Sequence, residues 1–309
     1  MQVVGNKQVL TNFIRKQRAL QKGSELPIRG ALLVLGGGVA GANGAGNLKA
    51  LAEVAPDAAD VVAGVSVGSA LVYALLAGAA RITPQVFNSL PWNKFIKGRP
   101  WNRKMEIDQV IKTMRALRAD NRVRDHRSDL VVYATEYSTG NSLAIEAKKA
   151  LDVVEAVQAS MMFPGLCSGV VRLDGREVVD GACGMPFPVR HIVKKYRPTD
   201  LLIIFNQPLP EHMGWLEWHA FPWLARAYLF LHGVPRPVRN STATMDRVMA
   251  YEMNMLTRRK AATWQDFVRG FFFKSKREPP RERKMIRWCI IAPEPHEAIS
   301  PLCMDRTLV

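Results

Sequence analysis

The chain has 309 residues, of which 48% are hydrophobic, so it can bury a sizeable core as one large α/β domain or two small ones. Its four cysteines show no C-x-x-C spacing, which argues against a zinc site or a disulfide framework and favours reduced thiols. The formal net charge of +16 favours an anionic partner such as a membrane surface or a nucleic acid.

The first 80 residues alternate between helical and extended patterns, which predicts a parallel α/β sheet. Short apolar runs in this part of the chain are typical of buried parallel strands. The elements we expect are a helix over 8–22, a strand over 30–35, a glycine-rich loop over 36–46, a helix over 47–54, a strand over 61–65 and an apolar helix over 70–80.

The second of these strands runs into Gly64-Val-Ser-Val-Gly68, a G-x-S-x-G motif between a strand and a helix. In that context the serine occupies a strained turn, and its flanking glycines avoid contact with the neighbouring strand and helix. The turn exposes the Ser66 hydroxyl at a helix N-terminus, where backbone N–H groups favour negative charge. Two alternatives stay open: a chance match to a short motif, and a membrane-spanning helix over the uncharged residues 61–80.

The glycine-rich loop contains G-x-G-x-x-G at Gly36, Gly38 and Gly41, a pattern of dinucleotide-binding folds. Those folds need an acidic residue at the end of the second strand, whereas Asp57 and Asp60 precede that strand, which disfavours this interpretation. The loop can instead direct backbone N–H groups at a developing oxyanion. Because successive parallel strands end at the same edge of a sheet, the loop and the serine turn should be neighbours.

The chain continues with further helices and strands and changes character after residue 206. We expect helices over 84–95, 104–118 and 151–161, a charged loop over 122–127, and strands over 129–135, 142–147, 177–179 and 201–205. Beyond residue 206, the composition is aromatic, Met-rich and basic, and it predicts a long helix over 242–260 and a last strand over 286–292. This region suits a lid or a membrane-contacting surface, or a helical layer that covers the core.

A catalytic serine needs a general base, and Asp180 is the residue that we favour. It follows a short strand and precedes Gly181 and Ala182, so its small neighbours leave the carboxylate accessible. The late histidines lack a persuasive loop context, although His296 stays an alternative. The competing interpretation of Asp180 is a turn residue that only caps its own backbone.

Three motifs in this order resemble the patatin-like phospholipases: Gly36-Gly-Gly-Val-Ala-Gly41, Gly64-Val-Ser-Val-Gly68 and Asp180-Gly-Ala182. The resemblance covers residues 29–205 and implies a three-layer α/β/α core with a mainly parallel sheet. It also implies a serine acyl hydrolase that cleaves lipid esters with a Ser-Asp dyad and no metal or cofactor. The expected domains are an N-terminal helical extension over 1–28, a catalytic core over 29–206, and a helical, basic C-terminal region over 207–309 packed on the core.

The resemblance implies a role for individual residues. Ser66 would be the nucleophile, and Asp180 would act as general base and then as general acid. Backbone N–H groups would hold the oxyanion. The implied oxyanion donors are Gly36, Gly37, Gly38 and Val67, and the motif glycines are Gly41, Gly64, Gly68 and Gly181.

One position departs from the family pattern. The family often has Arg or Lys before the last glycine of its first motif, where this chain has Ala40. The missing positive charge motivates an alternative function, a catalytically weak patatin-like protein that binds lipids or a partner.

Positive charge is concentrated near the C-terminus, where residues 226–287 hold 15 Lys and Arg against 5 Asp and Glu. We expect peripheral contact with anionic membranes, although a basic face exposed only to solvent is an alternative. No nucleic-acid recognition motif is evident, so no specific nucleic acid partner is expected. Residues 1–29 lack the apolar segment of a secretory signal, which predicts a cytoplasmic protein.

Overall fold

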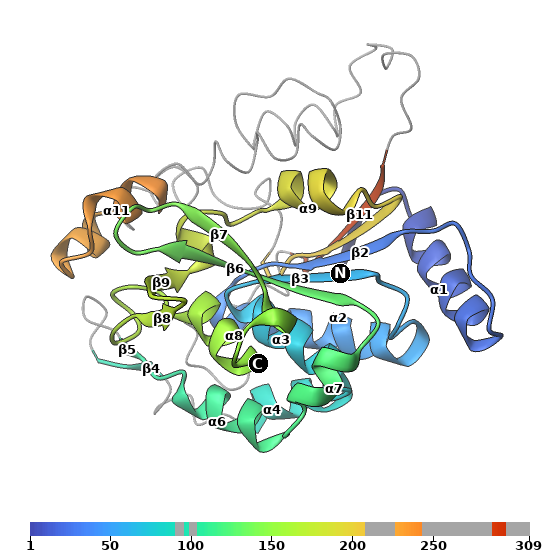
Figure 1. The fold of residues 1–309 in the computed structure, drawn as a ribbon, viewed down its shortest axis with the longest axis horizontal. Coiled ribbons are helices and arrows are strands. Elements are labelled where there is room, and N and C mark those ends of the chain that lie inside the picture. Colours follow the sequence, from blue (N-terminus) through green and yellow to red (C-terminus); the bar gives the residue numbers. More distant parts are fainter. Residues whose placement is uncertain (90–95, 99–103, 208–225, 243–285, 295–309) are drawn as a thin grey trace, which may run out of the picture.

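The computed structural model describes residues 1–89, 96–98, 104–207, 226–242 and 286–294. A mainly parallel sheet lies at the centre of this part of the chain (Figure 1). Its strands are β1 (Gln2–Gly5), β2 (Gly30–Val34), β3 (Val61–Val65), β6 (Asp129–Glu136), β7 (Ser142–Glu146), β8 (Val171–Leu173), β9 (Arg176–Asp180), β10 (Asp200–Ile204) and β11 (Arg287–Ala292). Paired strands follow the order β1-β11-β10-β2-β3-β6-β9-β8, and β7 also pairs with β6. The run from β11 to β6 is parallel, whereas β1, β7, β8 and β9 are antiparallel to their partners.

Helices connect the strands and cover both faces of the sheet. They are α1 (Gln8–Gln21), α2 (Gly41–Val54), α3 (Val67–Leu76), α4 (Thr83–Ser89), α6 (Asp108–Ala116), α7 (Asp120–Asp125), α8 (Val153–Met161), α9 (Val189–Tyr196) and α11 (Arg236–Thr242). A separate small sheet pairs β4 (Ile96–Lys97) with β5 (Lys104–Met105).

Two apolar clusters give the fold its three layers. β2 and β3 are buried along their whole length, as parallel strands covered on both faces must be. On one face Leu32 packs among residues of α1, α2, α3, α6, α7 and α8, and on the other Leu33 packs with Ile192 of α9. The predicted α/β/α architecture with a mainly parallel sheet is therefore confirmed (Figure 1).

The helix predicted over 47–54 is longer than expected, because α2 already begins at Gly41. Glycine disfavours a helix interior, so the sequence pattern indicated a loop here. The structure explains the glycines by close packing, since a Cβ at Gly44 would lie 2.9 Å from the Leu71 side chain of α3. The shorter helix predicted over 84–95 corresponds to α4, and its last residues lie outside the described ranges.

Two further local predictions are wrong. Residues 104–118 are not one helix, because β5 ends at Met105 and α6 begins only at Asp108. Residues 122–127 are not a charged loop, because α7 covers Asp120–Asp125 and buries Val123. The helix α9 was not predicted at all; Pro188 directly precedes it and forms its N-cap.

Residues 61–80 form a strand, a turn and a helix, so the interpretation of this segment as a single membrane-spanning helix is wrong. In the described ranges we find no helix with both the length and the apolar character that crossing a bilayer requires. The uncharged stretch instead serves the core, where every residue of α3 is buried.

The two ends of the described chain meet in the sheet, where β1 lies antiparallel beside β11. The N-terminal extension thus contributes a strand as well as α1, and β11 occupies the position of the predicted last strand. Apart from Thr242, which ends α11, the helix predicted over 242–260 lies outside the described residues. The division of the chain into three regions therefore stays a prediction.

Candidate active site

Ser66 occupies the turn between β3 and α3 with a backbone φ of 53°. A positive φ is strained for a residue with a side chain, so the surrounding packing must hold the turn. Two residues before and two residues after Ser66, only glycine fits. A Cβ at Gly64 would lie 2.4 Å from the Cα of Ser69, and one at Gly68 would lie 2.2 Å from the carbonyl oxygen of Val34. The turn therefore has the geometry of a nucleophile elbow.

Asp180, the last residue of β9, lies against this turn. Along β6, Val65 of β3 pairs with Tyr133, and Asp180 pairs with the next residue, Ala134, so the two strand ends reach the same point. The Ser66 hydroxyl donates a 2.6 Å hydrogen bond to Oδ2 of Asp180. The structure thus brings together the two residues that the sequence predicts as nucleophile and base.

The other carboxylate oxygen of Asp180 binds its own backbone. Oδ1 accepts a 2.8 Å hydrogen bond from the N–H of Ala182. The capping interpretation of Asp180 therefore holds alongside its contact with Ser66, with one oxygen for each. The backbone bond also fixes the rotation of the carboxylate, which keeps Oδ2 directed at Ser66.

Burial controls the acidity of Asp180, which is 1% exposed. Burial raises the pKa of this carboxyl to about 7, and the hydrogen bonds from Ser66 and Ala182 act in the opposite direction. A carboxylate with a pKa near neutrality accepts a proton more readily than an ordinary aspartate. That property is what a general base at neutral pH requires.

The histidines in the described ranges are engaged elsewhere. His126 pairs with Asp57, His191 shares a 2.8 Å hydrogen bond with the Tyr133 hydroxyl, and the ring of His232 packs on Tyr228. The remaining histidines, His212, His219 and His296, lie outside the described residues.

The glycine-rich loop follows β2 and borders Ser66, as the parallel pairing of β2 and β3 requires. A Cβ at Gly36 would lie 3.1 Å from Cβ of Ser66, so a side chain there would crowd the nucleophile. Gly37 and Gly38 adopt φ values of 152° and 54°, which glycine tolerates best. Gly38 and Val67 line the same cavity as Ser66. The loop and the start of α3 thus lie where oxyanion donors are expected, and that role stays a prediction.

The remaining motif residues serve close packing. A Cβ at Gly41 would lie 2.8 Å from the Val67 side chain, and one at Gly181 would lie 2.1 Å from the Tyr133 carbonyl oxygen. Ala40 is fully buried in the apolar cluster. The position where the family often has a basic residue is therefore a core position in this chain.

Two serines to which the sequence analysis assigned no role hold the backbone of Ser66. The Ser66 N–H donates a 2.9 Å hydrogen bond to Oγ of the fully buried Ser160, and the Ser69 hydroxyl donates a 2.5 Å bond to the Ser66 carbonyl oxygen. These two hydrogen bonds help to hold the turn in its strained conformation. Ser69 lies three residues after Ser66, on the first turn of α3, whereas Ser160 reaches Ser66 from α8, so only the fold connects Ser160 to Ser66.

Asn206, another unpredicted residue, supports the glycine-rich loop. It is 1% exposed and follows β10, which lies beside β2. Its amide donates to the carbonyl oxygen of Leu35 at 2.5 Å and points at that of Gly36 at 3.4 Å. A Cβ at Gly37 would lie 2.9 Å from Cβ of Asn206. The side chain therefore positions the peptide groups from which the loop N–H groups project.

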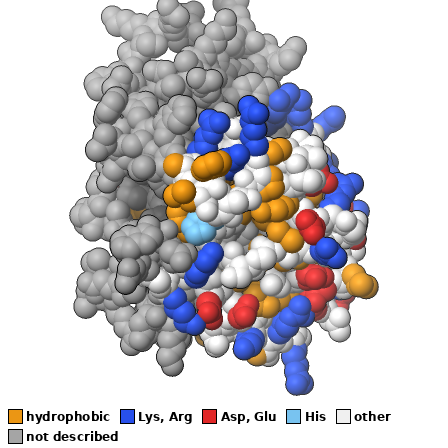
Figure 2. Space-filling model, turned by 90° about the vertical axis from the view of Figure 1, so that its left-hand side faces the viewer, with side chains coloured by type: hydrophobic (Ala, Val, Ile, Leu, Met, Phe, Trp, Pro, Cys, Tyr) orange, Lys and Arg blue, Asp and Glu red, His pale blue; other side chains and the backbone are white. Residues whose placement is uncertain are grey.

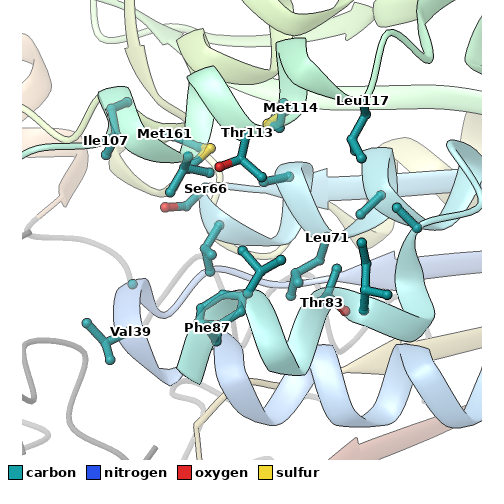
Figure 3. Close-up of a pocket in the computed structure, with 18 of the residues that line it drawn as sticks. Val39, Ser66, Leu71, Thr83, Phe87, Ile107, Thr113, Met114, Leu117 and Met161 are labelled. Carbon is teal, nitrogen blue, oxygen red and sulfur yellow. The ribbon is translucent and has the colours of Figure 1, made fainter. Parts of the chain in front are cut away.

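A cavity of about 100 Å³ opens beside Ser66, and its lining is almost entirely apolar (Figure 3). Its walls come from one face each of α3, α4 and α6, with Met161 near the serine. No charged side chain of the described residues lines it. Such a cavity suits a hydrocarbon chain attached to the group that Ser66 attacks.

The comparison with known protein families agrees with the motifs. The sequence profile of the patatin-like phospholipase family matches residues 32–193, more than half of the chain, and this range contains both Ser66 and Asp180. No curated protein matches the sequence significantly. Among solved structures, VipD from Legionella pneumophila is similar, with 12% sequence identity and a TM-score of 0.41. That alignment covers 65% of this chain and 56% of VipD.

Proposed function

The chain belongs to the patatin-like phospholipase family, and we propose that it is a serine acyl hydrolase that cleaves lipid esters with Ser66 and Asp180. The observation that carries the proposal is the 2.6 Å hydrogen bond between Ser66 Oγ and Asp180 Oδ2 beside an apolar cavity. A nucleophile within hydrogen-bond reach of a base of raised pKa is the minimal arrangement for acyl transfer.

In the proposed mechanism, Ser66 Oγ attacks the ester carbonyl carbon and its proton passes to Asp180. The negative charge on the carbonyl oxygen is held by backbone N–H groups of Gly36–Gly38 and Val67. Collapse of this intermediate breaks the ester bond, and Asp180 returns the proton to the departing alcohol. Water, deprotonated by Asp180, then attacks the acyl-serine; collapse of this second intermediate breaks the bond to Ser66 Oγ and releases the carboxylic acid, while Asp180 returns the proton to Ser66 Oγ.

Contact with an anionic membrane would supply the lipid. Residues 226–231 are helical, and Phe230 and Leu231 are 63% and 77% exposed. The Arg239 guanidinium of α11 lies 4.8 Å from the centre of the Phe230 ring, and Arg236 of the same helix is exposed. Figure 2 shows apolar side chains gathered among Lys and Arg side chains on the side of the molecule where α11 lies. Exposed apolar groups beside cationic ones suit the boundary between headgroups and acyl chains.

A lipid-panel assay tests the proposed function. The wild type should hydrolyse phospholipid or simple fatty-acyl esters and should react with a fluorophosphonate at Ser66. Ser66→Ala should lose both properties, and Asp180→Ala should lose hydrolysis while remaining folded. Full activity in Asp180→Ala would contradict the dyad, and a folded wild type that resists the probe would contradict the nucleophile.

A second candidate function is a lipid- or partner-binding protein with weak catalysis. The buried Ala40 favours it, because Ala40 supplies no positive charge at the position where the family often has Arg or Lys. Labelling of Ser66 without turnover of any ester in the panel, together with binding to vesicles, would support this second function over the first.

A further inference from the structure

The cavity beside Ser66 is bounded by helices that run along it. We propose that the depth of this cavity limits the acyl chain that can bind to a length of about 8–12 carbons. This inference rests on the proposed function for its reaction. The cavity would, however, bind the chain of a free fatty acid in the same way, so the two proposals can be tested apart.

Two rows of side chains follow the cavity from the nucleophile to its far end. α3 contributes one helical face, and α6 with its flanking residues contributes another. Figure 3 shows Ile107 and Met161 on the side of Ser66 and Leu117 at the far side. The rows are Val67, Ala70, Leu71 and Ala74 on α3, and Ile107, Val110, Thr113, Met114 and Leu117 on the second wall.

The helical rise sets the depth of the cavity. At about 1.5 Å per residue, α3 advances about 10 Å from Val67 to Ala74, and the second wall advances about 15 Å from Ile107 to Leu117. An extended alkyl chain advances about 1.25 Å per carbon, given tetrahedral angles and the length of a C–C bond. These depths correspond to about 8–12 carbons.

The volume and lining of the cavity agree with that length. A volume of about 100 Å³ admits roughly seven to ten water-sized groups, and a methylene is close to water in size. The hydroxyls of Thr83 and Thr113 donate to the carbonyl oxygens of Ala80 and Gln109, so they are turned to their own helices. A chain inside the cavity therefore meets hydrocarbon throughout.

Two alanines on α3 leave the space for the chain. Ala70 lies about 4.5 Å beyond Val67 along the helix, and Ala74 lies about 10 Å beyond it. A larger side chain at either position would fill the cavity at a different depth. Leucine suits this purpose, because it is nearly as good a helix former as alanine.

The experiment measures kcat/KM for p-nitrophenyl esters of 4 to 16 carbons with the full chain. For the wild type, kcat/KM should rise about threefold to fourfold per added methylene and stop rising at about 8–12 carbons. Ala70→Leu should lower the limit to about 4 carbons, and Ala74→Leu, which lies about 8 carbons deep, should lower it by less than Ala70→Leu does. Ala116→Leu, at an exposed position of α6 outside the cavity, is the matched control and should keep the wild-type limit.

Unchanged limits in folded Ala70→Leu and Ala74→Leu would overturn the inference while hydrolysis itself stands. A wild type that cleaves no ester would contradict the proposed function, and thermal shifts with free fatty acids of 6 to 16 carbons then decide the inference. A thermal shift that is greatest with acids of about 8–12 carbons supports the inference, and a thermal shift that does not depend on chain length overturns the inference. If the leucine variants do not fold, Leu117→Ala should extend the limit by about 2 carbons, and an unchanged limit there overturns it.

Discussion

Asp180 is a buried carboxylate whose two oxygens bind the Ser66 hydroxyl and the Ala182 N–H. Both donors are uncharged, and their hydrogen bonds only partly offset the effect of burial, which raises the pKa of Asp180 to about 7. The residue therefore exists in both protonation states near neutral pH. This balance makes the activity and the stability of the protein depend on pH in opposite ways.

Activity should require the ionised form of Asp180. We expect kcat/KM for an uncharged ester to rise about tenfold per pH unit below pH 7 and to level off above it, because only the carboxylate can accept the Ser66 proton. A pH profile from 5 to 9 with p-nitrophenyl butyrate measures this dependence. A profile that is flat over this range would contradict the role of Asp180 as the base.

Stability should show the reverse dependence. The pKa of Asp180 is about 7 in the folded chain against 3.8 for an ordinary aspartate, so folding takes up a proton between these values and the contribution of Asp180 to stability falls as the pH rises through this window. Asp180→Asn removes the buried charge. The free energy of unfolding of this variant, relative to that of the wild type, should therefore increase by on the order of 4 kcal/mol from pH 4 to pH 8. Urea unfolding at both pH values tests this, and an equal difference at both would contradict it.

Asn206 should act as a positioning residue for the oxyanion loop. Asn206→Ala removes the amide that binds the Leu35 carbonyl oxygen, so we expect kcat to fall roughly tenfold to a hundredfold with little change in KM, because a misplaced oxyanion donor is felt only in the transition state. Steady-state kinetics measure this split.

The matched control for Asn206 is Asn43→Ala. The Asn43 amide donates to the backbone carbonyl oxygen of Asn206 at 3.1 Å, so it packs in the same region without touching the loop carbonyls. The control should keep its kcat. Equal losses in both variants would indicate a merely structural role for Asn206.

At the scale of elements, the elbow between β3 and α3 depends on glycine for space. Gly68→Ala would place a Cβ 2.2 Å from the Val34 carbonyl oxygen and should destabilise the fold by about 3 kcal/mol or more. Gly46→Ala is the matched control, because Gly46 is an exposed residue inside α2 and its added Cβ meets nothing within 4 Å. It should stabilise the protein by about 0.5–1 kcal/mol. Chemical unfolding of both variants measures the contrast, and equal effects would contradict the packing argument.

Elements with a local signal were predictable from the sequence. The apolar runs of β2 and β3 and the G-x-S-x-G turn are enough to place the two loops at one edge of the sheet. Asp180 could be chosen because it follows a strand and precedes glycine. The beginning of α2 and the whole of α7 could not, since glycine and charged residues favour loops unless tertiary packing overrides them.

The support of the site depends on contacts between distant parts of the chain. Ser160 reaches the Ser66 backbone from α8, and Asn206 reaches the Leu35 carbonyl from the end of β10. Neither residue belongs to a motif of the nucleophile or the loop. Such residues follow from strand order and register, which a single sequence does not contain.

At the scale of the whole molecule, the site and the exposed apolar surface share one edge of the sheet. The Ser241 hydroxyl of α11 binds the Gly140 carbonyl oxygen just beyond β6, and the Tyr228 hydroxyl binds that of Gly165. Ser66 and Asp180 lie near the same end of β6, because β3 pairs with β6 through Val65 and β9 pairs with β6 through Asp180. A bilayer that touches Phe230 and Leu231 would therefore lie on the side of the nucleophile.

This arrangement predicts how the protein should bind membranes. Phe230→Ser and Leu231→Ser should each weaken binding to vesicles about tenfold, because each removes an exposed apolar side chain that the bilayer would bury. Arg236→Glu should weaken binding to phosphatidylserine vesicles by a similar factor and leave binding to neutral vesicles nearly unchanged. Vesicle co-sedimentation measures each partition coefficient.

Salt and a second exposed leucine provide the controls. Binding of the wild type to anionic vesicles should weaken as salt rises from about 0.05 to 0.5 M, since salt screens exposed charges. Leu151 is fully exposed but lies beyond β7 at the opposite end of β6, where Glu146 pairs with Val131, so Leu151→Ser should bind like the wild type. Equal binding to neutral and anionic vesicles, or equal losses in Leu151→Ser and Leu231→Ser, would contradict this surface as the membrane contact.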